Sequence, residues 1–315
     1  MVNPGIRQVG EGILFAGLGV AALIGWLSPP LALALGVAFA LTLNNPIPAF
    51  SHKLSKSLLQ ASVVGLGFGL NLQAVWLAGR TGFAFTVATI FGALLLGLWI
   101  GRLLKVESQT ALLVSSGTAI CGGSAIAAVG AVIGADKKAM SVSLATVFIL
   151  NAVALFIFPP LGHLLGMDQH QFGLWSAIAI HDTSSVVGAA SRYGTDALAY
   201  ATTVKLSRAL WIFPLALGLA FIKHRKSSRV AFPWFILFFL VAAGVRTVCP
   251  QGVAVYDALQ HAARSALVLT LFLIGTGLSR DAIRKVGFRP MLQGVLLWLV
   301  VSIVSLAAVT HFARP

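Results

Sequence analysis

Long apolar runs, each close to the length that crosses a lipid bilayer, recur along almost the whole chain. A membrane-spanning helix needs about 20 consecutive apolar residues. By that measure we expect an all-α polytopic membrane protein. The nine full spans predicted lie near residues 12–28, 30–44, 57–79, 82–104, 140–165, 197–222, 232–248, 256–278 and 290–312.

The composition agrees with that fold class. Of the 315 residues, 58% are hydrophobic and 10% are charged, whereas a soluble domain carries about 25% charged residues. No single soluble core could bury this much apolar surface, so a soluble enzyme or a nucleic-acid-binding domain is excluded. We therefore treat residues 1–315 as one integral membrane domain. The first apolar run lacks a basic leader and a small-residue cleavage site, so we expect a retained helix.

The net charge of +14 fits a membrane protein, because Lys and Arg concentrate in cytoplasmic loops that face anionic headgroups. Nucleic acid is not an expected partner. Cys121 and Cys249 have no metal-ligand spacing and do not indicate a disulfide framework. We expect neither a metal nor a cofactor.

Two apolar segments, near residues 109–134 and 171–191, are interrupted in the middle. The first break carries Gly122-Gly123-Ser124 and the second carries His181-Asp182-Thr183-Ser184-Ser185. Each half has about 10 residues, which is about 15 Å of helix and half a bilayer. Each segment is therefore either a broken spanning helix or a re-entrant hairpin.

The distribution of basic residues favours two re-entrant hairpins. With the N-terminus in the cytoplasm, re-entrant hairpins place Lys137 and Lys138 inside and the loop with Asp168 outside, as the positive-inside rule requires. Crossing segments would reverse both assignments. The hairpin tips are then expected to enter from opposite faces and to meet near the midplane, and the C-terminus lies outside. The basic loops that stay inside in either scheme are residues 223–229 and 280–289.

Internal similarity indicates two half-repeats, residues 57–165 and 171–312. Residues 121–128 correspond to residues 182–189, and a full span follows each. Interrupted helices repeated in inverted orientation are typical of secondary transporters. One feature departs from a simple repeat, because the Gly-rich span precedes its hairpin in the first half and follows it in the second.

Ionisable residues inside spans are costly and are functional candidates by default. The candidates here are His181, Asp182, Lys205 and Arg208. Lys205 and Arg208 share a helix face and either receive an anion or a carboxylate or snorkel to the surface. His181 and Asp182 are candidates for carrying a coupled proton, although Asp182 could simply cap the second half-helix.

Hydroxyls and half-helix N-termini near the breaks offer neutral donors to an anion, with ordinary helix capping as the alternative. Asn151 and Asn71 are further polar candidates within spans. The substrate-binding residues that we expect are Cys121, Gly122, Gly123, Ser124, Asn151, Thr183, Ser184, Ser185, Lys205 and Arg208.

Two other functions would use the same residues. A proton- or sodium-linked cation antiporter would use Asp182 as the carrier and Arg208 as its structural partner. An intramembrane hydrolase is disfavoured, because the adjacent His181 and Asp182 diverge by about 100° on a helix and no nucleophile-elbow motif is present. We therefore do not expect an enzyme.

The runs Gly117–Ala128, Ala179–Ala190 and Val204–Trp211 resemble the YeiH-type UPF0324 family, which carries the label of sulfate exporters. The likeness extends over nearly the whole chain. It implies a bacterial inner-membrane protein that exports sulfate or a related sulfur oxyanion. It also implies a plan similar to antiporter-like and bile-acid-transporter-like folds with crossed discontinuous helices. The family pattern has Ser and Ala where this chain has Ala119 and Gly123, so one hydroxyl is missing.

Together these observations predict a secondary transporter of a small anion, with sulfate as the leading candidate. No ATP-binding motif is present, so a proton or sodium gradient would drive transport. The expected partners are the anion, the bilayer and the coupling ion. The sequence leaves open whether the chain forms a homo-oligomer.

Overall fold

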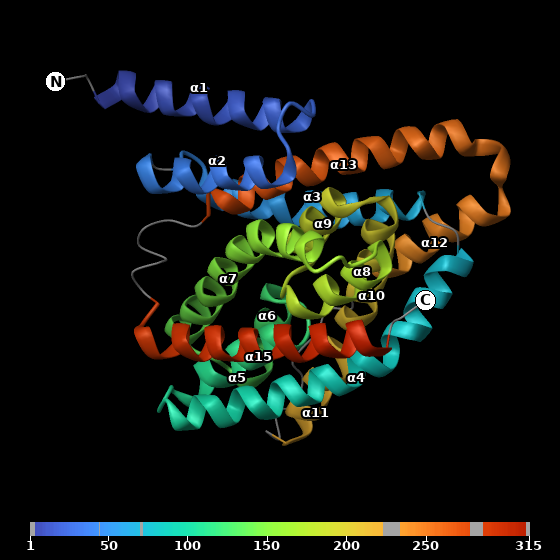
Figure 1. Ribbon diagram of the computed structural model, residues 1–315. Helices are drawn as coiled ribbons and strands as arrows, with labels where there is room; N and C mark the ends of the chain where they lie inside the picture. The colour runs from blue at the N-terminus through green and yellow to red at the C-terminus, as the bar shows by residue number, and fades with distance from the viewer. Residues whose placement is uncertain (1–3, 44, 70–71, 223–233, 278–285, 313–315) are drawn as a thin grey trace. The chain divides into compact units, whose positions relative to one another are not determined.

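The computed structural model describes residues 4–43, 45–69, 72–222, 234–277 and 286–312, and helices are the only regular elements within these ranges (Figure 1). The chain forms two compact units, each built from two stretches of sequence. Unit 1 comprises residues 1–72 and 235–281, and unit 2 comprises residues 73–234 and 282–315.

Unit 1 is organised around one long helix, α13 (Val253–Gly275), which packs against α1, α2 and α3. Small residues permit these close crossings, since a Cβ added at Gly36 would lie 2.3 Å from the carbonyl oxygen of Phe272. The other elements of this unit are α1 (Pro4–Leu23), α2 (Pro29–Thr42), α3 (Pro48–Gly67), α12 (Trp234–Val248) and the short 3-10 helix η1 (Pro250–Gly252).

Unit 2 contains both interrupted segments. Its helices are α4 (Leu72–Leu103), α5 (Ser108–Ala119), α6 (Gly123–Ile133), α7 (Lys137–Leu164), α8 (Gln169–Ala179), α9 (Thr183–Tyr193), α10 (Thr195–Leu210), α11 (Ile212–Ile222) and α15 (Phe288–Phe312). The breaks between α5 and α6 and between α8 and α9 lie where the sequence predicts them.

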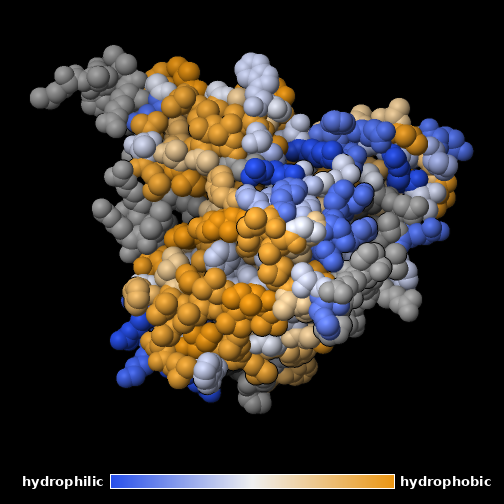
Figure 2. Space-filling view, in the orientation of Figure 1, coloured by the Kyte–Doolittle hydropathy of each residue, from blue (hydrophilic) through white to orange (hydrophobic). Residues whose placement is uncertain are grey.

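Among the described residues, four helical stretches are long and apolar enough to cross a membrane: Thr86–Leu103, Lys138–Leu164, Pro250–Gly275 and Phe288–His311. Large apolar side chains such as Leu95 on α4 and Ile303 on α15 are exposed, by 70% and 63%, and apolar residues cover much of the face in Figure 2. The chain is therefore a multi-pass membrane protein, but the expected count of nine full spans is not confirmed.

Two expected spans have different boundaries in the structure. The expected span 57–79 is wrong, because α3 ends at Gly67 and α4 starts at Leu72. Three glycines at positions 65, 67 and 69 weaken a helix at this point. The expected span 82–104 largely coincides with the second part of α4, which includes the apolar stretch Thr86–Leu103. The expected span 197–222 is divided at Trp211, between α10 and α11. Pro214 explains that division, since it cannot donate to the carbonyl of Leu210.

Both interrupted segments fold back on themselves as hairpins. In the first, the main-chain N–H of Asp136, beyond the end of α6, donates to Gln109 Oε1 at the start of α5 (3.0 Å). In the second, the N–H of Asp196, beyond the end of α9, donates to Gln169 Oε1 at the start of α8 (3.0 Å). Each segment therefore returns to the end from which it started, and neither crosses unit 2 as a discontinuous helix.

The two hairpins approach each other from opposite ends of α7. Asp136, at the base of the first hairpin, caps the start of α7, and four residues separate the end of α7 from the first helix of the second hairpin. At the tips, a Cβ added at Gly122 would lie 3.0 Å from the Cβ of Asp182. Within unit 2 the two tips therefore lie against each other, and their hairpins start at opposite ends of α7.

Candidate functional site: the meeting point of the two hairpin tips

The two hairpins have the same internal contacts at positions 60 residues apart. In each, the residue at the break donates its N–H to a serine carbonyl four residues earlier, Ile120 to Ser116 and Ile180 to Ser176. The base contacts of Gln109 and Gln169 follow the same spacing. The alignment of the two half-repeats inferred from the sequence, which matches Cys121 with Asp182, is therefore wrong by one residue. Cys121 corresponds to His181, and Gly122 corresponds to Asp182.

The C-terminal end of α8 is covered by side-chain donors. Lys205 Nζ donates to the carbonyls of Ala177 (3.2 Å) and Ile180 (2.7 Å). Trp298 Nε1 on α15 donates to the carbonyl of Ala179 (3.1 Å). A helix leaves its last carbonyls unsatisfied and carries a partial negative charge there, so Lys205 stabilises this half-helix through both effects.

Arg208 does the same for the first hairpin. One terminal nitrogen of its guanidinium donates to the carbonyl of Ala119, the last residue of α5, and the other donates to Thr89 Oγ1 on α4 (2.7 Å). The contact made by residue 119 thus uses its main chain and needs no hydroxyl. Lys205 and Arg208 are both completely buried, so the alternative in which they snorkel to the surface is excluded.

The N-terminal ends of α9 and α6 differ in how they are capped. Asp182 Oδ1 accepts the N–H of Ser185 (2.7 Å), and the hydroxyls of Ser184 and Ser185 lie close to the same carboxylate. Asp182 is therefore the cap of α9. In α6 the equivalent residue is Gly122, whose φ of +65° suits glycine and which supplies no capping side chain. The space that a side chain at Gly122 would need is taken by Asp182.

Asn151 holds the second tip from the middle of α7. Its Oδ1 accepts the main-chain N–H groups of His181 (3.0 Å) and Asp182 (3.4 Å). Because main-chain N–H groups can only donate, these contacts fix the orientation of the amide. Asn151 Nδ2 is consequently left as a donor that faces away from them.

Several buried polar atoms around the tips have no hydrogen-bond partner within the described ranges. Hydrogen bonds normally satisfy buried polar groups, and one left without a partner is destabilising by about 1–3 kcal/mol. Five such atoms belong to residues at or next to the contacts described above: His181 Nδ1 and Nε2, Asn151 Nδ2, Arg208 Nε and Thr118 Oγ1.

The structure brings together most, but not all, of the expected site residues. Gly123 and Thr183 are partly buried, and Ser124 is exposed. The expected residues that are buried around the tips are Cys121, Gly122, Asn151, His181, Asp182, Ser184, Ser185, Lys205 and Arg208. The candidate Asn71 lies outside the described residues. In the part of the chain that the structure describes, Lys205 and Arg208 form no ion pair with Asp182; they donate hydrogen bonds to main-chain carbonyls and to a threonine hydroxyl.

Three residues of the site were missed by sequence reasoning. Thr118 has a buried hydroxyl, Thr89 accepts from Arg208, and Trp298 covers the end of α8. Thr89 and Trp298 lie 119 residues from their partners, and no local pattern reports such a contact. Thr118 could have been found, because it is a polar residue one turn before a break.

Comparison with known proteins identifies the family. The family model described as conserved hypothetical protein 698 matches residues 20–294. A UPF0324 membrane protein of Bacteroides thetaiotaomicron is 54% identical over 291 residues, which cover 92% of this chain and 88% of the relative. One of Porphyromonas gingivalis is 52% identical over 286 residues, covering 90% and 87%.

A third relative, from Geobacter sulfurreducens, is 48% identical over 283 residues, covering 90% of this chain and 91% of the relative. No solved structure matches the chain. The family resemblance of the break motifs is thus confirmed, and the relatives are named as membrane proteins without a substrate. The chain belongs to the UPF0324 family of membrane proteins.

Proposed function

We propose that the protein is a secondary transporter of a small inorganic or sulfur-containing anion, which binds where the two hairpin tips meet. The observation that carries this proposal is the excess of donors among the buried atoms without a partner. Asn151 Nδ2 and Arg208 Nε can only donate, and Thr118 and His181 can each donate as well. A ligand rich in acceptor oxygens would satisfy all of these groups, and a metal cation would satisfy neither of the two obligatory donors.

Electrostatics favours the same class of ligand. Two basic side chains, Lys205 and Arg208, are buried around the tips together with one acidic side chain, Asp182. The N-termini of α6 and α9 add partial positive charge. Sulfate is the leading candidate because it offers four acceptor oxygens and two negative charges to a site with several donors.

The cation-antiporter alternative is less well supported. A cation carrier needs acceptor atoms that are free to coordinate an ion. The carboxylate of Asp182 already accepts from the first turn of α9, and Asn151 Oδ1 already accepts two main-chain donors.

Coupling to protons follows from the position of His181 beside the proposed anion. A bound anion favours the protonated form of a neighbouring histidine or carboxyl group. Binding would then take up a proton at His181 or Asp182, and release of the anion would free it. Proton–anion symport, or the reverse reaction, needs no separate ion site, with sodium as the other coupling ion to test. We assign no catalytic step to the protein.

The test is uptake of radiolabelled sulfate by proteoliposomes, with and without a pH gradient and with and without a sodium gradient. The informative variant is Asn151→Asp, which keeps the Oδ1 acceptor for His181 and replaces the free NH2 donor by a negatively charged oxygen. We expect this variant to insert normally and to lose sulfate uptake.

Asn45→Asp is the matched control. Asn45 Oδ1 also accepts a main-chain N–H, that of Ile47 (2.9 Å), and its Nδ2 donates to Thr276 Oγ1 (3.1 Å), so the same chemical change is made in unit 1, at an amide that belongs to neither hairpin. Uptake by Asn151→Asp equal to that of wild type and of Asn45→Asp would overturn the proposed site.

We further propose the bacterial inner membrane as the location, with a cytoplasmic N-terminus and an external C-terminus. The hairpin geometry supports this orientation through the positive-inside rule. A cysteine introduced by Lys137→Cys should be labelled from the cytoplasm, and one introduced by Asp168→Cys from outside. The opposite labelling pattern would reverse the orientation.

A further inference from the structure

An arginine lies in the middle of the longest helix of unit 1. Arg264 is eleven residues from each end of α13 (Val253–Gly275), within a stretch long and apolar enough to cross a membrane. A charged residue at such depth is costly and indicates a function unless it is paired. Arg264 is partly buried, and its Nε is buried with no partner among the described residues.

Arg264 belongs to a polar stripe. Asp257, His261 and Arg264 are spaced four and three residues apart, so they occupy an arc of about 60° on one helix face. Asp257 and His261 are exposed. The far side of the same helix segment is exposed and apolar, with Val255, Leu259 and Ala262. One half of α13 is therefore amphipathic, although the helix is of membrane-spanning length.

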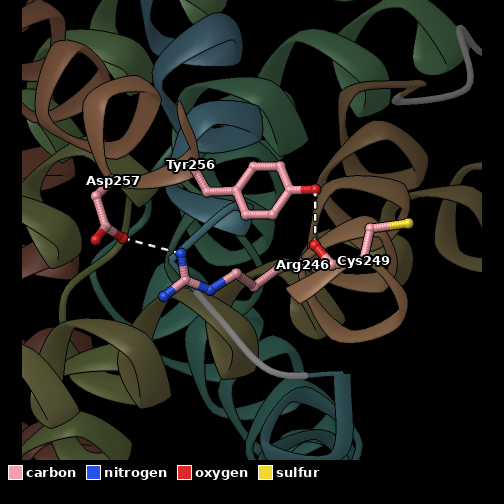
Figure 3. A network of polar contacts seen from close by, with 4 residues as sticks. All are labelled: Arg246, Cys249, Tyr256 and Asp257. Atoms are coloured by element: carbon pink, nitrogen blue, oxygen red, sulfur yellow. Dashed lines mark hydrogen bonds and ion pairs between the residues drawn. The ribbon is translucent and has the colours of Figure 1, made fainter. Parts of the chain in front are cut away.

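The negative charge of the stripe is already neutralised. Arg246 at the end of α12 donates to Asp257 Oδ1 (2.9 Å) and lies over the ring of Tyr256, with 5.7 Å from its guanidinium carbon to the ring centroid (Figure 3). The hydroxyl of Tyr256 donates to the carbonyl of Cys249 (3.0 Å), which ties the start of α13 to the end of α12. Because Arg246 compensates Asp257, Arg264 supplies the net charge of the stripe.

Snorkelling alone does not account for this arrangement. Arg264 lies seven residues beyond Asp257, which is about 10.5 Å along the helix axis. An arginine that merely reached for the surface would not need His261 exposed on the same face between the two. Polar residues along a helix of this length indicate contact with water at that depth, since lipid disfavours them.

We propose that the Asp257–His261–Arg264 stripe borders a water-filled passage that admits small anions, with Arg264 as its deepest charge. The role of this passage in the cell rests on the proposed anion transport. The contact of the stripe with water and its attraction for anions do not depend on that transport. The proposal assigns an anion-attracting surface to unit 1, which contributes no residue to the hairpin tips.

The test compares two cysteine variants in a Cys249→Ser background, in which the remaining Cys121 is buried. His261→Cys places a thiol on the stripe. Leu259→Cys places one on the opposite face and two residues nearer the helix start, so proximity to the membrane surface would favour Leu259→Cys. Both are treated in membranes with an anionic and with a cationic methanethiosulfonate reagent, neither of which crosses lipid.

We expect His261→Cys to react and Leu259→Cys to remain largely unreacted, and we expect the anionic reagent to be favoured at His261→Cys. A unit charge about 6 Å away in water changes the local concentration of a singly charged reagent about threefold. Adding Arg264→Gln should therefore lower the anionic-to-cationic rate ratio about tenfold, whereas Arg264→Lys should preserve it.

Equal reaction of the two thiols, no reaction at His261→Cys, or a ratio unchanged by Arg264→Gln would each overturn the proposal. Cysteine labelling does not require transport, so the labelling result tests the passage independently of the result of sulfate uptake. A protein that transports no sulfate can still show the labelling pattern, and an active transporter can lack it.

Discussion

Arg208 is the residue whose loss should separate binding from folding most clearly. Arg208→Ala removes the donors to Ala119 and Thr89 and the free Nε. The carbonyl of Ala119 is then left buried without that partner, at a cost of about 1–3 kcal/mol. Domains are stable by about 5–15 kcal/mol, so we expect the variant to fold and insert with a lowered melting temperature.

Arg208→Ala should lower the affinity for the anion by a larger factor than it lowers the stability of the protein. A hydrogen bond from a charged group contributes about 1.5–3 kcal/mol, which corresponds to about 10- to 150-fold in affinity. Arg208→Lys keeps the charge, but one ammonium group cannot replace three differently directed donors. We therefore expect it to lose at least about tenfold as well.

The assay is sulfate uptake at several concentrations in proteoliposomes, together with thermal unfolding of the same preparations. Arg102→Ala is the control, because it removes an exposed arginine from the last turn of α4 and should change neither reading. A stable Arg208→Ala protein with uptake within twofold of wild type would refute the reasoning and make Arg208 a purely structural cap.

Three further predictions concern the tips and the base of the first hairpin. Gly122→Ala combines a φ of +65° with a Cβ 3.0 Å from that of Asp182, so it should lower the melting temperature more than Gly166→Ala, where φ is +63° and nothing lies within 4 Å. The strain at Gly122 should be about 1–3 kcal/mol, and equal effects of the two changes would mean that the tips do not touch. Wild-type sulfate affinity should weaken as pH rises, because a bound anion favours the protonated form of His181, and His181→Gln should flatten that slope; identical slopes would remove His181 from coupling. Burial raises the pKa of Glu107 and hydrogen bonds from the first turn of α5 lower it, with a net pKa below the usual value. Its stabilisation of α5 is therefore present above the ordinary pKa and lost as pH falls through the lowered one. Glu107→Ala should speed hydrogen exchange in that turn at neutral pH and make little difference in acid, and unchanged exchange at neutral pH would refute the capping role.

The breaks could be predicted from the sequence because glycines and capping residues interrupt otherwise apolar segments. Gly122 and Asp182 lie at the predicted positions, and the charge pattern around Lys137 and Asp168 favoured hairpins over crossing helices. These are local signals, since turn chemistry and loop charge depend on neighbouring residues.

Helix boundaries in uniformly apolar sequence could not be predicted in the same way. Residues 57–104 read as two spans of similar length, and nothing in their hydropathy marks the true division after Gly67. Hydropathy measures compatibility with lipid, whereas the division depends on weak helix formation at clustered glycines. The division at Trp211 depends likewise on one proline three residues later.

The roles of the buried cations were the least predictable part of the site. The spacing of Lys205 and Arg208 places them on one helix face, and the sequence predicts that they bind an anion or a carboxylate. Their actual partners include the carbonyls of Ile180 and Ala119, and a carbonyl partner leaves no signature in residue type. Arg264 lies inside an apolar span, and only its spacing from Asp257 and His261 marks it in the sequence.

Locating a bound anion in the protein is the most direct test of the proposed transport site. Selenate matches sulfate in shape and charge and can be identified by anomalous scattering in crystals of the protein. We expect selenium where the hairpin tips meet, with its oxygens within hydrogen-bonding distance of Asn151 Nδ2 and Arg208 Nε, and we expect this signal to disappear in Asn151→Asp. A selenium site elsewhere in the protein, or none at a concentration that saturates transport, would contradict the account.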